Sequence, residues 1–236
     1  FRSLDLPTSR RTEATTRAEF SETCLRGQFN QVAYLVERGG IDLTAVDDDG
    51  RTVVHICARH RYCNEVLRYL LEKGVGASDS DNVGATPLHA AASSRNVAGI
   101  EQLLQFGAKV DVKDKSGCTP LFAACKAIAH RAIVELLKGE ANAALVNGED
   151  DQTALHALLV ASQGKKSSRK SRENFGPPST SAALSLRETV DCLVKAGAPL
   201  MVTDRSGRTI FDEAAACDAE LVHHMLLECN VKSTEA

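Results

Sequence analysis

The chain has 236 residues, of which 43% are hydrophobic and 25% charged, so it can form a sizeable core and is too apolar for a disordered protein. Its 28 Lys and Arg against 31 Asp and Glu give a net charge of −3, which disfavours nucleic-acid binding by the whole chain. Trp is absent and aromatic residues make up 4%, so a core of small and aliphatic side chains, as in packed helices, is expected.

Residues 1–15 have no apolar period, and we expect a flexible leader there. Because the first residue is Phe1, the sequence is expected to be a piece of a longer protein. No apolar run reaches the roughly 18 residues of a membrane span. The eight cysteines are unevenly spaced and include no C-x-x-C pair, so we expect reduced, mostly buried thiols in a protein of the cytoplasm or the nucleus.

From residue 50 onward a nine-residue motif recurs. It reads GATPLHAAA at 84–92 and GCTPLFAAC at 117–125, with weaker copies at 50–58, 151–159 and 207–215. Its threonines are Thr52, Thr86, Thr119, Thr153 and Thr209, at intervals of 34, 33, 34 and 56 residues. Thr is a good N-cap and Pro suits the first helical position, so each copy predicts a helix start. The Leu and Ala that follow fall on one helical stripe.

A second apolar run follows each motif, as at 66–71, 100–104 and 133–137. Gly74, Gly107, Gly139 and Gly197 come directly after such runs, where a helix often ends in a left-handed residue. Asp and Gly then cluster as turn residues before the next Thr. The unit is therefore a turn, a helix, a tight turn and a helix, and two short helices must stack on neighbours to bury their apolar sides.

The motif Gly-x-Thr-Pro-Leu-His-x-Ala-Ala at this period resembles the ankyrin repeat family, over roughly residues 16–230. The resemblance implies an all-α solenoid of about six helix-turn-helix units with short hairpin-like turns between units, over residues 16–232. We place the units at about 16–47, 48–81, 82–114, 115–149, 150–204 and 205–232. The first and last lack parts of the motif and are expected to be capping units with one polar face.

The interval of 56 residues predicts an insertion between the two helices of the fifth unit, at 164–186. This segment is basic and rich in Ser and Pro, which predicts a disordered surface loop. Three interpretations stay open: an inert loop, a basic address or acidic-partner patch, and a regulatory segment. Phosphate on Ser167, Ser168 or Ser171 would erase or invert its charge.

Three groups of residues invite a chemical interpretation. His55, His89 and His156 occupy the same place in three motifs, and in the ankyrin family this histidine is structural and hydrogen-bonds near the turn. Cys57, His60 and Cys63 lie close in sequence, but we expect Cys57 on the core stripe and the three side chains pointing apart. A second loose cluster is Cys217, His223, His224 and Cys229. We expect no metal, no cofactor and no catalytic residue in this sequence.

In the ankyrin family partners contact the hairpin tips and the inner face of the first helices. Carried onto this sequence, the tip residues are Asp48, Asp49, Arg51, Asn82, Val83, Ala85, Lys115, Ser116, Asp150, Gln152, Arg205 and Arg208. The inner-face residues are Arg59, His60, Ser93, Ser94 and Lys126. Acidic residues outnumber basic ones at 42–51, 79–81 and 149–151, which suggests a partner with a basic or mixed-charge segment. Asp is also common in turns for its backbone hydrogen bonds alone.

The sequence therefore predicts a monomeric scaffold or adaptor module that binds another protein on its concave face and hairpin tips. We expect no small-molecule substrate, no nucleic acid and no membrane span. The alternative is the non-catalytic recognition segment of a larger enzyme, such as a ubiquitin-ligase or kinase component.

Overall fold

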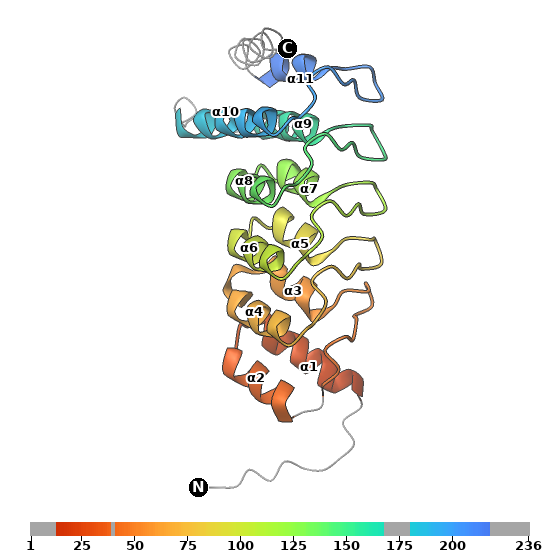
Figure 1. The fold of residues 1–236 in the computed structure, drawn as a ribbon, viewed down its shortest axis with the longest axis vertical. Helices are drawn as coiled ribbons and strands as arrows, with labels where there is room; N and C mark the ends of the chain where they lie inside the picture. Colours follow the sequence, from red (N-terminus) through yellow and green to blue (C-terminus); the bar gives the residue numbers. More distant parts are fainter. Residues whose placement is uncertain (1–12, 39–40, 168–179, 218–236) are drawn as a thin grey trace.

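The helices of the chain lie in pairs, and the pairs are stacked in one long row (Figure 1). The structure is a computed structural model that describes residues 13–38, 41–167 and 180–217. The pairs are α1 (Glu13–Leu25) and α2 (Phe29–Arg38), α3 (Val53–Arg59) and α4 (Asn64–Glu72), α5 (Pro87–Ser93) and α6 (Val97–Gln105), α7 (Pro120–Lys126) and α8 (His130–Lys138), and α9 (Ala154–Ser167) and α10 (Thr180–Lys195). A 3-10 turn, η1 (Arg61–Cys63), joins α3 to α4, and α11 (Ile210–Cys217) follows the last pair.

The stack has two layers of helices and one row of hairpin-like loops. The first helices of the pairs contact one another in the order α1, α3, α5, α7, α9 and α11, and the second helices do so in the order α2, α4, α6, α8 and α10. The loops between pairs all project from the same edge, on the right of Figure 1. Apart from two isolated β-bridges, the described residues form no strand. The predicted all-α solenoid is confirmed.

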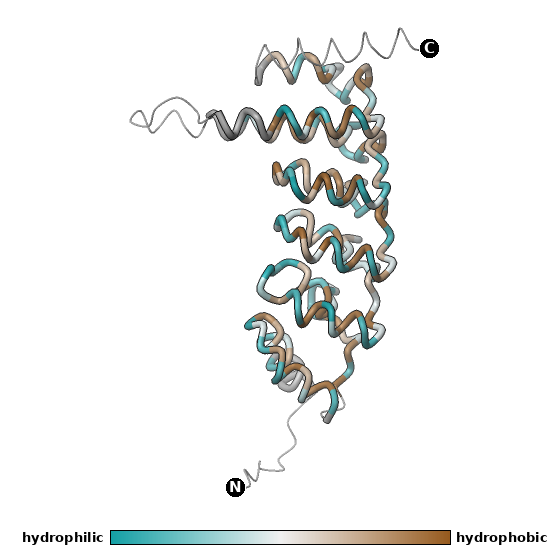
Figure 2. Tube along the Cα trace, turned by 60° about the vertical axis from the view of Figure 1, so that its left-hand side comes forward, coloured by the Kyte–Doolittle hydropathy of each residue, from teal (hydrophilic) through white to brown (hydrophobic). Residues whose placement is uncertain are grey.

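The core runs the length of the stack as a ladder of equivalent side chains. Leu88, Leu121 and Leu155 follow the capping threonines of α5, α7 and α9, and each is at most 1% exposed. Ala91 and Ala124 are fully buried on the same stripe, where small side chains let neighbouring first helices approach closely. Figure 2 shows apolar and polar residues alternating along each helix. The helices therefore bury one side against the adjacent pair.

Three of the four glycines expected at helix ends are left-handed. Gly74, Gly107 and Gly197 have φ angles of +84°, +78° and +87°. The prediction for Gly139 is wrong: it is the C-cap of α8 with φ −79°, and the next residue, Glu140, takes the left-handed conformation with φ 65°. The fourth pair thus ends one residue later than glycine spacing suggests.

The helices of the fifth pair reach further than expected. Residues 164–167, expected in the disordered 164–186 loop, form the end of α9, and residues 180–186 form the start of α10. The first of these stretches contains two lysines and the second two alanines, and Lys and Ala are good helix formers. Likewise α1 begins at Glu13, inside the predicted leader of residues 1–15. Residues 1–12 and 168–179, and the second helix predicted for the sixth unit, lie outside the described residues.

A substitution at Gly117 tests how tightly neighbouring hairpins pack. A Cβ there would lie 2.3 Å from the backbone nitrogen of Gly148, and Gly117 also has φ +75°. Gly107 is the matched control, since it has φ +78° with nothing within 4 Å of the same Cβ. Gly107→Ala should lower the free energy of unfolding by about 1–2 kcal/mol through φ strain alone. Gly117→Ala should lower it by about 3 kcal/mol or more, because backbone must move as well. Urea unfolding measures both, and equal losses would contradict the close packing.

Candidate partner-binding surface

Each hairpin is held by one side chain that accepts hydrogen bonds from its own backbone. In four hairpins this residue is an aspartate whose carboxylate accepts two backbone N–H bonds of 2.8–3.0 Å: Asp47, Asp81, Asp114 and Asp204. In the hairpin before α9, Asn147 takes this place and accepts from the N–H of Gln152 at 2.7 Å. These carboxylates are therefore structural, as Asp in turns often is.

Neighbouring hairpin tips are joined by one backbone hydrogen bond each. The N–H groups of Asn82, Lys115, Gly148 and Arg205 donate to the carbonyls of Asp49, Val83, Ser116 and Asp150, at 2.8, 2.9, 2.9 and 2.8 Å respectively. The side-chain amide of Asn82 also donates to the Asp48 carbonyl at 2.9 Å. The tips thus form one continuous edge whose backbone is fixed, while most side chains project outward.

The motif histidines link successive units. The Nδ1 atoms of His55 and His89 accept the backbone N–H of Thr52 and Thr86, at 3.2 and 3.0 Å. An accepting Nδ1 leaves the proton on Nε2, which donates across the unit boundary to the carbonyls of Ala85 and Cys118, both at 3.0 Å. His156 repeats the contact with Thr153. The structural role expected of these histidines is confirmed.

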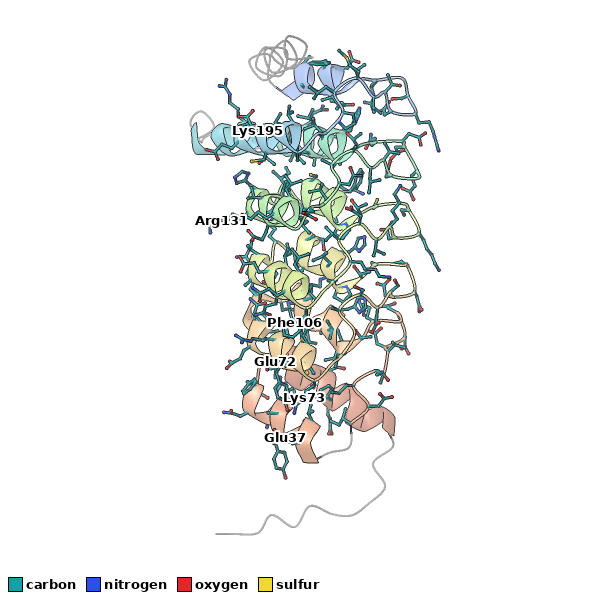
Figure 3. The ribbon with its side chains drawn as sticks, viewed as in Figure 1. Glu37, Glu72, Lys73, Phe106, Arg131 and Lys195 are labelled. Atoms are coloured by element: carbon teal, nitrogen blue, oxygen red, sulfur yellow. The ribbon has the colours of Figure 1, made fainter. Side chains whose placement is uncertain are left out.

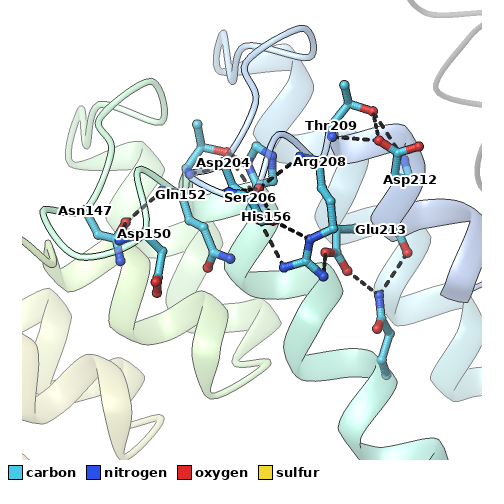
Figure 4. Close-up of polar contacts among 12 residues, drawn as sticks. Asn147, Asp150, Gln152, His156, Asp204, Ser206, Arg208, Thr209, Asp212 and Glu213 are labelled. Atoms are coloured by element: carbon cyan, nitrogen blue, oxygen red, sulfur yellow. Dashed lines mark hydrogen bonds and ion pairs between the residues drawn. The ribbon is translucent and has the colours of Figure 1, made fainter.

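The last hairpin is tied to α11 and α9 by a polar network (Figure 4). Arg208 pairs with Asp204 at 3.1 Å and with the buried Glu213 at 2.8 Å. The side-chain amide of Gln163, on α9, donates to the Glu213 carboxylate at 2.6 Å. Burial would raise the pKa of Asp204, but hydrogen bonds from Ser206 and Arg208 outweigh it and hold the pKa well below its usual value. In α11, Asp212 replaces the motif histidine and accepts the backbone N–H of Thr209 at 2.8 Å.

The residues predicted to contact a partner fall into two rows on opposite edges. Those of the tips lie in the hairpins, and every one of them is exposed or half-buried. The others lie at the far ends of the first helices: Arg59, Ser93 and Lys126 end α3, α5 and α7, and His60 and Ser94 are C-caps. A helix of seven residues, about 10 Å long, separates the rows, and the contact of either row with a partner stays a prediction.

Two hairpins carry exposed aspartates in addition to the side chains that hold the hairpins together. Asp48 and Asp49 are exposed in the second unit, as are Asp150 and Asp151 in the fifth. Some of this charge is compensated locally, because Asp49 lies 2.7 Å from Arg51 and Asp151 lies 3.5 Å from Arg205. Asp47 and Arg51 also pair at 2.9 Å, and this hydrogen bond raises the pKa of Arg51. The tips are therefore acidic with cations interspersed.

Sequence reasoning missed three cations at the other edge. All three are exposed: Arg61 and Arg95 lie in the connections between first and second helices, and Arg131 lies in the first turn of α8. Arg61 and Arg95 stand nine residues after Thr52 and Thr86, a regularity that the sequence contains. The sequence does not show that they lie on the same edge as Arg59 and Lys126, because this depends on where each helix ends.

The cysteines of the first two units are closer together than expected. Cys57 and Cys63 do not point apart: interaction of the Cys57 thiol with the thiols of Cys24 and Cys63 raises the pKa of Cys57 well above its usual value. All three residues are fully buried, and the Cys63 thiol also donates to the Cys24 carbonyl at 3.1 Å. His60 stacks instead on Tyr62, with ring centroids 5.3 Å apart.

The described residues contain neither a cluster that could hold a metal nor a helix that could span a membrane. Within the ranges given above, no group of three or more His, Cys, Asp and Glu is arranged to hold a metal ion. None of the described helices is both long enough and apolar enough to cross a membrane. The predicted cluster of Cys217, His223, His224 and Cys229 lies mostly outside the described residues.

Known proteins share this repeat and this fold. Residues 20–114 match the family model for ankyrin repeats in three copies. An ankyrin repeat domain from Acinetobacter baumannii has a similar structure, with a TM-score of 0.72 and 19% identity, over 89% of this chain and 97% of that one. The tyrosine-protein kinase Shark of Drosophila melanogaster is 34% identical over 76 residues, which are 32% of this chain and 8% of the kinase.

Residues 20–114 are therefore similar to ankyrin repeats, and the described chain has the fold of an ankyrin repeat domain. The chain spans only 8% of the length of the kinase that it matches.

The histidine links predict how stability depends on pH. Burial lowers the pKa of His89 below its usual 6.5, against the opposing effect of the Cys118 carbonyl. Because the unfolded chain then binds the proton at higher pH than the folded one, the contribution of neutral His89 is complete above about pH 6.5 and is lost as pH falls towards the folded-state pKa. Gln at this position can still bond the Thr86 N–H but does not titrate. His89→Gln should therefore lose less free energy of unfolding than the wild type between about pH 7.5 and about pH 5.5.

Urea unfolding at the two pH values measures this difference. His60→Gln is the control, since this histidine stacks on Tyr62 and lies outside the capping contacts. The same pH dependence in His89→Gln as in the wild type and in His60→Gln would contradict a titrating link at His89.

Proposed function

We propose that the chain is a protein–protein interaction module, a scaffold or adaptor that binds its partner through the hairpin tips and the adjoining surface of the first helices. One observation carries this proposal: backbone bonds join tip to tip, as from Lys115 to Val83, while the side chains at these positions are exposed. A rigid backbone with outward side chains lowers the ordering cost of binding a partner. Ankyrin repeats generally serve as protein-interaction modules, which supports the same conclusion.

The partner that fits the tips carries a basic or mixed-charge segment. Asp48 and Asp150 supply exposed negative charge at the second and fifth hairpins, while Arg51, Lys115 and Arg205 add cations among them. Complementary charge would steer the encounter and set the register of such a segment along the edge. The aspartates that hold the hairpins contribute to this field although their carboxylates are committed to backbone bonds.

A second candidate is that the module is the non-catalytic recognition segment of a larger enzyme. The similarity to the kinase Shark favours a kinase over the ubiquitin-ligase component also considered, because the matched segment makes up a small part of that enzyme. Both candidates assign the same binding role to the residues of this chain. The full-length reading frame of the parent protein distinguishes them, since it contains a catalytic domain only in the second case.

The basic segment of the fifth unit is the proposed place of regulation. Ser167 is the last residue of α9, and Ser168 and Ser171 lie outside the described residues. Phosphate on Ser167 would add up to about two negative charges at that helix end, where negative charge is unfavourable. Such a change, or recognition of the basic residues as an address for the nucleus, would couple this unit to the state or location of the parent protein.

Charge reversal at the tips tests the proposed binding surface. The variant Asp48→Lys, Asp49→Lys, Asp150→Lys and Asp151→Lys should recover less of its partners in a quantitative pull-down, by about tenfold for a partner that the tips contact. The loss should grow as salt is lowered, because screening weakens exposed charges. The matched control reverses four acids away from the tips: Glu37, Glu72, Glu101 and Glu140.

The control has the same formal charge change and all four of its residues are exposed. Partners recovered equally by the wild type and the tip variant would contradict the tip surface. If both variants lose their partners equally, the loss comes from the change in net charge and not from the tip surface.

A further inference from the structure

A row of exposed cations lies along the edge opposite the hairpins. This basic row consists of Arg59 at the end of α3, Arg61 in η1, Arg95 in the turn between α5 and α6, Lys126 at the end of α7, and Arg131 in the first turn of α8. Figure 3 labels Arg131 on the left of the stack, away from the hairpins on the right. The row spans the second, third and fourth pairs.

Among the described residues, no cation of the basic row pairs with a carboxylate, whereas the arginines of the tips do. Among the described residues none of the five forms an ion pair, and Arg95 donates instead to the carbonyl of Ala127. At the tips, by contrast, Arg51, Arg205 and Arg208 each pair with a carboxylate at 2.7–3.5 Å. Carboxylates nearby are few: Glu65 is exposed at the start of α4, and Glu188 faces His130 at 3.8 Å. The edge therefore has an excess of positive charge in a chain whose net charge is −3.

The repeat sets the spacing of the basic row. Arg59 and Lys126 occupy equivalent positions two units apart, and the bond from Arg95 to the Ala127 carbonyl ties the third pair to the fourth. Packed helices lie about 8–10 Å apart, so successive units present a cation about every 10 Å. An extended peptide rises about 3.3 Å per residue, and three residues therefore match one unit.

An aromatic pair stands at one end of the row. His60 and Tyr62 are stacked with an interplanar angle of 30°, and Tyr62 is 63% exposed. A pocket of about 530 Å³ lies beside them, lined by Gly27, Gln28, Phe29, Asn30, Gln31 and Glu65. This end can take an uncharged or apolar side chain next to the cations.

We propose that the basic row is a second interaction surface, and that it binds an extended acidic peptide segment with a carboxylate at every third residue. The partner would run along the stack, with an apolar residue at the His60–Tyr62 end. This inference goes beyond the proposed function, because it joins Arg59 and Lys126 with Arg61, Arg95 and Arg131 in one surface and assigns that surface a second partner, of opposite charge. A nucleic acid fits less well, since a long polyanion would also meet the acidic hairpins.

A direct binding measurement tests the basic row. The probe is a fluorescein-labelled peptide of about twelve residues with Glu at every third position among Ser and Gly. Its comparison peptide has the same composition with the Glu residues contiguous. In fluorescence anisotropy at about 50 mM salt, the variant Arg59→Glu, Arg95→Glu and Lys126→Glu should bind the spaced peptide at least about tenfold more weakly than the wild type. The contiguous peptide should bind the wild type more weakly than the spaced one.

The control variant reverses three exposed lysines elsewhere: Lys73, Lys109 and Lys195. It should bind the spaced peptide like the wild type, as should the tip-reversal variant, which leaves the basic row intact. Full affinity in the row variant, or an equal loss in the lysine control, would overturn the proposal. A single-stranded oligonucleotide of similar length that binds the wild type more tightly than the peptide would overturn the assignment to an acidic peptide.

Neutral substitutions keep the test valid if the reversal variant unfolds. Arg59→Gln, Arg95→Asn and Lys126→Gln remove the same charges, and Asn tolerates the left-handed φ of 61° at Arg95. The neutral variant should also weaken binding of the spaced peptide with an unchanged thermal transition, and unaltered binding would overturn the proposal. Because the tip variant is measured with the same peptide, failure here leaves the proposed function at the tips separately testable.

Discussion

The contact between one helix pair and the next is the interaction on which the structure depends. The first helices α3, α5 and α7 have seven residues each, too few to be stable alone, and Leu88 and Leu121 are buried where these helices pack against the elements around them. The polar links follow the same direction: His55 reaches the Ala85 carbonyl and His89 reaches the Cys118 carbonyl, each in the following unit. The backbone hydrogen bonds between neighbouring hairpin tips also connect each unit to the next.

Because these links use buried side chains and backbone, the exposed side chains are free to vary. The same positions carry Arg59, Ser93 and Lys126 in successive units, while Leu88 and Leu121 repeat unchanged inside. The variable positions separate by charge, with acid at the hairpins and cations at the opposite helix ends. Half-buried Ile56, Ala90 and Ala123 lie between them on the first helices. Under the two proposals above, the hairpin tips and the basic row would engage segments of opposite charge.

Much of this architecture could be predicted from the sequence, because the spacing of Thr52, Thr86, Thr119 and Thr153 reflects a local cap that recurs with each unit. Features that depend on the neighbouring unit could not. The left-handed Glu140 and the approach of Cys24 to Cys57 arise from packing that no local pattern encodes. The basic row was missed because its members come from helix ends and turns of three units, and only the stacked structure brings them into line.

Helicity of isolated fragments tests the dependence on stacking most directly. A peptide of residues 82–114, one complete unit, has no neighbour on either side, whereas residues 48–149 contain three units and the links between them. Far-UV circular dichroism should show no thermal transition for the single unit and a cooperative one for the three-unit fragment. A single unit that is helical and melts cooperatively by itself would contradict the account.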